Sequence, residues 1–421
     1  MELLACGHLA NEGPFRTCLH LCVEEPEEIS RLYTGVGGEY HLVCETCGKL
    51  DDPWSQLAVV CLGCTERADD EKVTHISGQP EIRYDDRPLT GTFHEEPAYA
   101  QPVNDRCLAP SGDGWLVYTG KYLVQLGGAS YRLKMRKDQE DDKAFGTPGP
   151  TVHASSDGRF AAVVWDHGRY GEVVDLAKGQ MTVTLDRGDY RNYTTPFPFA
   201  FLADGTFITA TSWNRLDRVN SASGSLLTPR DTKWRKGDER PENYLDYFHG
   251  RLTVSPTGAW LVDDGWVWAP VGIPLLIDVA AWQNGTTYAA EQGRSLTYRD
   301  YAWNQPVAWL TDNVVAIQRI GEDDAAMVDG VQLYDAPSGE RVDTLFGPKG
   351  QMWAVDGQLA VAAEHGLEFW DPAEGARVGV LPGYRPSAYN PRTRTFAALE
   401  DWVLRTYQLP IVAAANLCSD G

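Results

Sequence analysis

Cysteine residues at metal-ligand spacing gather near the N-terminus. Seven of the nine cysteines of this 421-residue chain lie within residues 1–66, together with three histidines. Cys44 and Cys47 form one Cys-x2-Cys pair, and Cys61 and Cys64 form a second pair thirteen residues further on. Two thiolates on such a tight turn can both reach one tetrahedral zinc ion. The pattern predicts a zinc-binding module over residues 1–66.

A second, less regular set lies upstream. Cys6-x-His8 and Cys18-x3-Cys22 predict a Cys3His site, with His20 competing for one ligand place. The predicted ligands of one or two structural zinc ions are Cys6, His8, Cys18, Cys22, Cys44, Cys47, Cys61 and Cys64. A disulfide framework is the alternative, but Cys-x2-Cys knuckles and a cytosolic chain argue against it.

Two pairings of these ligands stay open. In a sequential arrangement, the upstream four residues form one site and the two Cys-x2-Cys pairs form the other. In an interleaved arrangement, Cys6 and His8 join the pair at 44 and 47, while Cys18 and Cys22 join the pair at 61 and 64. In so small a module, the bound metal would supply much of the folding free energy.

The rest of the chain repeats a turn followed by an apolar strand. Residues 151–185 are the clearest copy, with four short strands and turns at 157–158 and 178–179. The first turn of each copy is Asp113-Gly114, Asp157-Gly158, Asp204-Gly205, Thr257-Gly258, Asp312-Asn313, Asp356-Gly357 or Arg392-Thr393. Seven copies with a period near 40–50 residues predict a mainly β chain with a seven-bladed β-propeller. A pair of β-sandwiches, or a smaller propeller with insertions, is the alternative.

A second landmark carries a family resemblance. Asp335 and Asp371 each end an apolar strand and are followed four residues later by glycine, as in Leu333-Tyr334-Asp335 and Phe369-Trp370-Asp371. These stretches resemble WD40-like and quinoprotein-like propeller repeats, over roughly residues 105–410. The Gly-His dipeptide of regular WD40 blades is missing, so the chain resembles a divergent WD40-like propeller.

The N-terminal module has its own resemblances. Its second ligand set is close to zinc-ribbon spacing, and the interleaved arrangement resembles the cross-brace of RING-type domains. That resemblance implies a ubiquitin-ligase type of adaptor whose propeller recruits the substrate. The spacing departs from the RING pattern, because the first pair is Cys-x-His and no separate Cys-x-His follows in the middle.

The sequence contains no recognisable catalytic set. GxSxG, GxxxxGK[ST] and HExxH motifs are all missing. The repeat alignment places mostly small, nonpolar residues on the innermost strands, where propeller enzymes collect polar side chains; His153 is the exception. We therefore predict a protein that is not an enzyme, with a propeller hydrolase holding a channel metal as an alternative.

The net charge of the chain indicates which classes of partner it can attract. The formal net charge is −22, and residues 1–75 alone contain five basic and fourteen acidic residues. Such a chain repels nucleic acid and anionic membranes, whereas it would attract a basic protein. The sequence also shows neither a run of apolar residues long enough to span a bilayer nor a secretory signal, which predicts a cytoplasmic location.

One long connection is the predicted partner-binding segment. Residues 228–249 are charged and aromatic, and long loops in a compact fold are often functional. The residues that we expect to bind a partner are Lys233, Trp234, Arg235, Lys236, Tyr244 and Tyr247. The loop Glu322-Asp323-Asp324 is a second candidate.

The predicted organisation has four parts. Residues 1–66 form the zinc module, 67–104 a polar linker or strap, 105–412 the seven-bladed propeller and 413–421 a tail. The predicted function is a protein-interaction scaffold that docks a basic protein through the propeller, with the zinc module as a second docking element.

Overall fold

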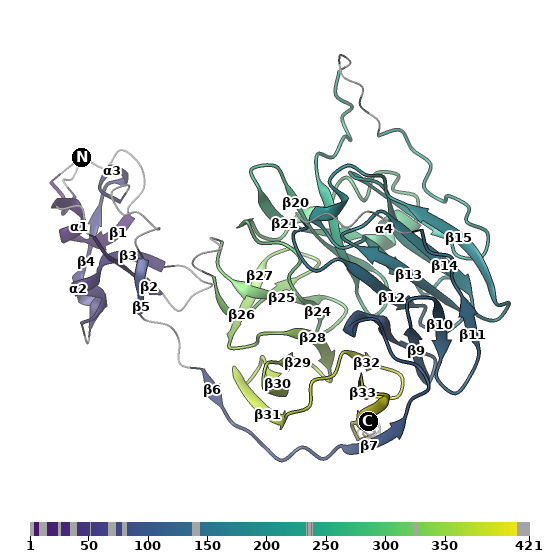
Figure 1. The fold of residues 1–421 in the computed structure, drawn as a ribbon. Coiled ribbons are helices and arrows are strands. Elements are labelled where there is room, and N and C mark those ends of the chain that lie inside the picture. The colour runs from purple at the N-terminus through teal and green to yellow at the C-terminus, as the bar shows by residue number, and fades with distance from the viewer. Residues whose placement is uncertain are drawn as a thin grey trace, which may run out of the picture.

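Seven sheets arranged around a ring dominate the structure (Figure 1). The computed structural model describes residues 4–7, 15–23, 27–33, 40–50, 52–65, 73–77, 82–136, 144–232, 234, 237, 239–322 and 327–410. Within these residues, two smaller sheets precede the seven. The predicted fold class, mainly β with a seven-bladed propeller, is confirmed.

The second blade shows how the repeat folds. Strands β12 (Gly149–Ala154), β13 (Phe160–Asp166), β14 (Tyr170–Asp175) and β15 (Gln180–Asp186) pair antiparallel in chain order. Gly158 closes the first turn at φ +69°, a conformation that glycine adopts without steric cost. The predicted four-strand unit is therefore confirmed.

The other blades follow the same plan, with variations. Blade one has β8 (Leu108–Ser111), β9 (Gly114–Tyr118), β10 (Tyr122–Gln125) and β11 (Ser130–Arg132), and blade three has β16 (Phe199–Phe201), β17 (Thr206–Ser212) and β18 (Arg215–Asn220). Blade four has β19 (Phe248–Val254), β20 (Trp260–Val267), β21 (Val271–Asp278), β22 (Arg294–Ser295) and β23 (Arg299–Asp300), and blade five has β24 (Val307–Trp309), β25 (Val314–Ile320), β26 (Val328–Asp335) and β27 (Arg341–Phe346). Blade six has β28 (Gln351–Val355), β29 (Gln358–Ala363), β30 (Gly366–Asp371) and β31 (Ala376–Pro382), and blade seven has β32 (Ala388–Asn390), β33 (Thr395–Glu400) and β34 (Val403–Gln408). Helix α4 (Val279–Gln283) and the 3-10 turns η3 (Asp105–Cys107) and η4 (Asn192–Thr194) lie in connections. All seven predicted turns join the first strand of a blade to its second.

Apolar side chains on both faces of each sheet hold the ring together. In β13, Ala161 and Val163 pack toward the first blade, whereas Ala162 and Val164 pack toward the third. This alternation is the period of two of a β-strand that is buried on both faces. Seven buried clusters, one at each junction between neighbouring blades, close the ring.

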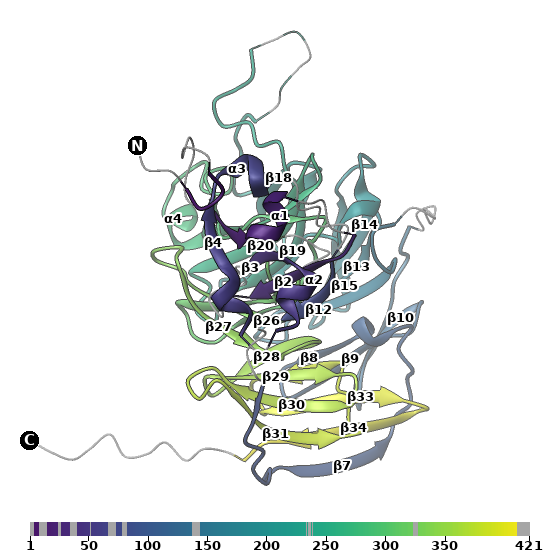
Figure 2. The ribbon, with the colours of Figure 1, turned by 90° about the vertical axis from the view of Figure 1, so that its left-hand side faces the viewer.

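The segment before the first blade completes the last blades. Strand β7 (Thr92–Pro97) pairs antiparallel with β34, and β6 (Arg83–Tyr84) pairs parallel with β31. Figures 1 and 2 show this segment running along the outer edge of the last two blades. Two strands of the predicted linker or strap at 67–104 thus belong to the propeller sheets. This closure links the two ends of the ring by main-chain hydrogen bonds.

The N-terminal module is small and has short elements. Strand β1 (Phe15–Cys18) pairs with β4 (Leu57–Val60), and β2 (Ile29–Tyr33) lies between β3 (Tyr40–Cys44) and β5 (Val73–Ser77). The helical turns are α1 (Leu19–Val23), α2 (Glu45–Gly48), η1 (Pro53–Gln56) and α3 (Leu62–Thr65). Tyr40 packs against a small cluster in the fifth blade, formed by Ile320, Val328 and Phe346, and so joins the module to the propeller.

Candidate metal centres and interaction face

Three copies of one local structure supply most of the cysteines. In each copy a strand ends at or just before a cysteine, and a single helical turn then carries a second one. The copies are β1–α1 with Cys18 and Cys22, β3–α2 with Cys44 and Cys47, and β4–α3 with Cys61 and Cys64. In the two Cys-x2-Cys copies, the single helical turn brings both sulfur atoms to the same side of the chain, whereas the sulfur atoms of Cys18 and Cys22, four residues apart, meet different neighbours. The predicted knuckles therefore exist as local structures.

The first cluster joins Cys18, His20, Cys44 and Cys47. Their ligand atoms all lie within 4.8 Å of one another. The Nδ1 atom of His20 is 3.2 Å from the sulfur of Cys47, and the backbone N–H of Cys44 donates to the sulfur of Cys18 at 3.2 Å. Cys18 and Cys47 are buried, whereas the His20 ring is exposed. The cluster is a Cys3His donor set with one side open to solvent.

The second cluster joins Cys6, Cys61 and Cys64. The backbone N–H of Cys61 donates to the sulfur of Cys6 at 3.4 Å, and Gly7, at φ +78°, closes the turn that carries Cys6. Cys22, on α1, lies beside this cluster, and its thiol interacts with that of Cys64. The cluster therefore consists of three close sulfur atoms with a fourth thiol next to one of them.

The observed grouping differs from both pairings that the sequence left open. Cys44 and Cys47 meet Cys18 and His20, so they join neither the other Cys-x2-Cys pair nor Cys6. Along the chain the first cluster is nested within the second, because Cys6 precedes it and Cys61 and Cys64 follow it. His20, expected only as a competitor, belongs to a cluster, and His8 lies outside the described residues.

The chemistry of the two donor sets suits a soft or borderline cation. None of the described cysteines forms a disulfide. Burial, reinforced by the neighbouring thiols, raises the pKa of Cys47 and of Cys64 to about 12. Thiols packed so closely remain protonated unless a cation compensates their charge, and thiolate and imidazole ligands are those that zinc prefers. Both clusters therefore fit a zinc ion.

The propeller channel lacks a comparable donor set among the described residues. A cavity of about 810 Å³ opens at one end of the channel and is lined largely by Ala109, Ala154, Phe199, Phe201 and other apolar side chains. His153 also lines it, and burial lowers its pKa to about 4, so it is neutral at physiological pH. The described His, Cys, Asp and Glu side chains form the two N-terminal clusters and no third one in the channel.

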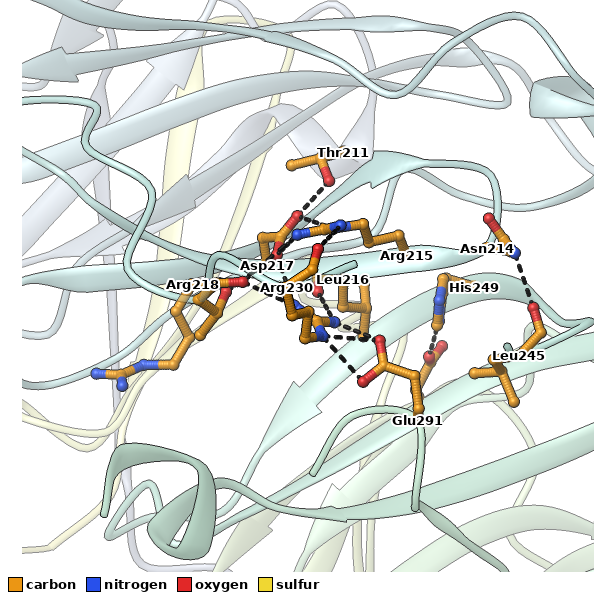
Figure 3. A network of polar contacts seen from close by, with 12 residues as sticks. Thr211, Asn214, Arg215, Leu216, Asp217, Arg218, Arg230, Leu245, His249 and Glu291 are labelled. Atoms are coloured by element: carbon orange, nitrogen blue, oxygen red, sulfur yellow. Dashed lines mark hydrogen bonds and ion pairs between the residues drawn. The ribbon is translucent and has the colours of Figure 1, made fainter. Parts of the chain in front are cut away.

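The predicted partner-binding connection starts from a buried anchor. The third blade has three strands, and Arg230 donates to the Leu216 carbonyl of its outermost strand, β18, at 2.7 Å (Figure 3). Its guanidinium donates to Asp217 at 2.7 Å and to Glu291, and all three side chains are at most 3% exposed. Arg215 also donates to Asp217, at 2.7 Å. This charge network fixes the base of the connection.

The described part of the tip presents aromatic rings. Trp234 is 40% exposed and lies edge-on to Tyr244, and the Arg240 guanidinium lies over both rings at 5.3 and 5.0 Å. Tyr247 is 1% exposed, and its hydroxyl donates to a backbone carbonyl, so it anchors the connection and offers no surface to a partner. Lys233, Arg235 and Lys236 lie outside the described residues, as do Asp323 and Asp324 of the second candidate loop.

An aromatic cluster that the sequence analysis did not identify lies on one face of the ring. Seven rings contact one another in a chain that crosses blades two to five, and we call them the aromatic platform: Phe145, Tyr190, Trp213, Phe248, Trp266, Trp268 and Trp303. The stacked pairs Phe248–Trp266 and Trp266–Trp303 have centroids 4.4 and 5.0 Å apart. These stacked rings are buried, whereas Phe145, Tyr190 and Trp268 are 50 to 53% exposed.

Hydrogen bonds from two indole N–H groups to Thr194 hold the buried rings of the platform in place. The indole N–H of Trp266 donates to the Thr194 hydroxyl at 3.1 Å, and that of Trp303 donates to the Thr194 carbonyl at 2.9 Å. The long connection reaches the same place, because Asn214, next to Trp213, donates to the Leu245 carbonyl at 2.8 Å. Half-exposed rings on a rigid base are typical of protein-binding surfaces.

The repeat alignment contains a signal for this cluster. Phe145, Tyr190 and Trp303 precede the first strand of a blade, while Trp213 and Trp268 lie between a second and a third strand. Antiparallel strands place both kinds of connection on the same face of the disc. The opposite face carries the predicted first turns, whose residues Asp157, Asp204 and Asp356 are exposed. One face of the disc is thus aromatic, and the other consists of short polar turns.

Among known proteins, the similarities that were found are to solved structures. No protein-family model and no curated protein sequence matches this chain. Among solved structures, a chain from one titled "Crystal Structure of Mitotic Checkpoint Complex" matches with 13% sequence identity and a TM-score of 0.49. The match covers 79% of this chain and 97% of the other. Among the described residues, no helix has the length and apolar character that a bilayer crossing requires.

Proposed function

We propose that the chain is a non-enzymatic scaffold that docks a protein partner on its aromatic platform. The observation that supports this most is the run of seven contacting rings, of which three stay half-exposed beside the long connection. Large rings held rigidly lose little conformational entropy on binding, which makes them effective contact residues. Trp234, at the tip of the connection, extends the same surface.

The proposed partner presents a basic segment. Around the platform the exposed carboxylates include Asp189, which is 88% exposed, and Asp246, which is 47% exposed. The whole chain carries a net charge of −22. Within the chain, Arg191 already lies over the ring of Trp268 at 5.0 Å, as Arg240 does over Trp234. Aromatic faces with an acidic surround suit arginine or lysine side chains.

Site-specific crosslinking tests the docking surface. A photo-crosslinking amino acid replaces Tyr190 or Trp268 on the platform, and Val342 or Met181 as controls. The control side chains are 55 and 54% exposed, so they match the platform positions in exposure. We expect one partner band from both platform positions, absent from both controls and weakened by high salt. Equal crosslinking from all four positions would refute the platform as the docking surface.

We further propose that both N-terminal clusters hold structural zinc. The donors would be Cys18, His20, Cys44 and Cys47 in one site, and thiolates only in the other. Zinc would supply tetrahedral ligation, and the protein would supply the knuckles and their N–H donors to sulfur. Elemental analysis of the intact protein tests this proposal, with two zinc ions per chain as the expected value.

A ubiquitin-ligase type of adaptor is the second candidate function. The two clusters do not follow one another along the chain, which favours it, because sequential sites would argue against a cross-brace. The grouping differs in detail from the predicted cross-brace, since Cys6 joins Cys61 and Cys64. Autoubiquitination with purified activating and conjugating enzymes tests this function. A signal that disappears in a Cys47→Ser variant would support it.

A further inference from the structure

We infer that Cys22 is the fourth ligand of the second site and that helical turn α1 makes the two sites bind metal interdependently. The inference builds on the proposal that both clusters hold zinc. Along α1 and the residue before it, Cys18 and His20 face the first cluster, while Cys22 contacts Cys64 in the second. Five residues of chain thus carry ligands for two ions.

The geometry of α1 couples the sites because the segment is too short to order one half alone. Cys18 ends β1, which pairs with β4, and β4 leads directly into Cys61 of the second cluster. Losing the second ion would free Cys22, Cys61 and Cys64, and with them the packing of α1 against α3. The first ion would then lose the support that orients Cys18 and His20.

The apolar core around α1 also couples the two sites. The apolar cluster of the module consists of Cys18, Leu21, Leu32, Val43 and Cys47, so two of its five buried members are ligands of the first site. Leu21 of α1 is fully buried and packs in the same cluster as Cys18 and Cys47. Because little other apolar surface is buried around α1, the folding of this segment depends on the binding free energy of both ions.

Metal content of the whole protein tests the assignment. Wild type is compared with Cys22→Ser and with Cys107→Ala, whose thiol is buried in the propeller. We expect two zinc ions in wild type and in Cys107→Ala, and fewer than one in Cys22→Ser. Two ions in Cys22→Ser would show that this residue is not a ligand. One ion would show that the sites are independent.

A measurement without substitution guards against a variant that simply misfolds. Native mass spectrometry of the wild-type chain at half the saturating zinc counts chains with no, one and two ions. Independent equal sites would leave about half of the chains with one ion, whereas coupled sites deplete that species well below half. A one-ion population of half or more would overturn interdependence. Wild type without any zinc would instead refute the zinc proposal itself.

Discussion

The N-terminal module and the propeller reach stability by different means. The apolar cluster of the module has five buried members, two of which are cysteines of the first cluster. The propeller buries an apolar cluster at each of its seven blade junctions, and the chain segment before the first blade completes the last. A domain with so small a core needs a metal or other cross-link, whereas a large ring is stable through burial.

The difference has a consequence for how each part presents a surface. The propeller can leave large rings half-exposed, because its stability does not depend on burying them. The module has no such surplus of buried apolar surface, since Cys18 and Cys47 are both proposed metal ligands and members of its core. Recognition by exposed side chains is therefore expected from the disc, and metal dependence from the module.

The largest expected effect is selective loss of the module on chelation. A strong zinc chelator should make residues 1–77 sensitive to protease while a fragment beginning near residue 82 survives, because only the module is proposed to fold around zinc. Limited proteolysis with mass spectrometry measures this outcome. If the module and the propeller resist the protease equally after chelation, the module does not depend on zinc for its folding.

The buried charge network gives the next largest effect. Arg230→Met leaves the buried carboxylate of Glu291 without its cation and leaves Asp217 with Arg215 alone. Breaking such a pair by removing one partner costs about 3–5 kcal/mol. Urea unfolding followed by tryptophan fluorescence measures the change. Arg240→Met is the matched control, because its ion pair with Asp246 is exposed and should contribute less than about 1 kcal/mol.

Truncation at the base of the platform should cost somewhat less. Trp266→Ala removes a ring that is 3% exposed and stacks on Phe248 and Trp303, for a loss of about 3 kcal/mol. The same unfolding measurement applies. A loss below about 1 kcal/mol would mean that the buried rings do not support the platform.

A buried carboxyl should make the propeller less stable as pH rises. Burial raises the pKa of Asp264 to about 7, with Asp263 adding to the effect and Arg299 and Arg251 opposing it. The folded state therefore binds more protons than the unfolded state between about pH 4 and 7, so stability falls as pH rises through this window. Thermal unfolding at several pH values measures it.

The control for this pH dependence keeps the shape of the side chain. Asp264→Asn retains an oxygen that can accept from the Gln305 backbone N–H and carries no charge at any pH. The variant should show a flatter profile and be more stable than wild type at pH 8. An unchanged slope would assign the pH dependence to another group.

The smallest effect on stability should come from the exposed part of the platform. Trp268→Ala removes a ring that is 51% exposed, so we expect a change below about 1 kcal/mol in unfolding free energy. Partner capture, in contrast, should fall at least tenfold, since exposed rings contribute most when a partner buries them. Loss of both stability and capture would place Trp268 in the core instead.

Local pattern alone was enough for the blades and the knuckles. An Asp-Gly pair between apolar runs fixes a hairpin through glycine's freedom at φ > 0, as Gly158 and Gly205 show. Cys44-x2-Cys47 likewise fixes a knuckle, because its ligands are three residues apart. Short-range geometry of this kind depends on neighbours in the chain, so the sequence determined it.

Tertiary structure decided everything that depends on distant segments meeting. The spacing of the ligands allowed several groupings. Tertiary structure brought Cys18 and His20 to Cys44 and Cys47, because the pairing of strands determines which knuckles lie next to each other. It buried Tyr247 and gathered Phe145, Trp213 and Trp303 on one face. These residues lie far apart in the chain, and only the closure of the ring brings their rings into contact.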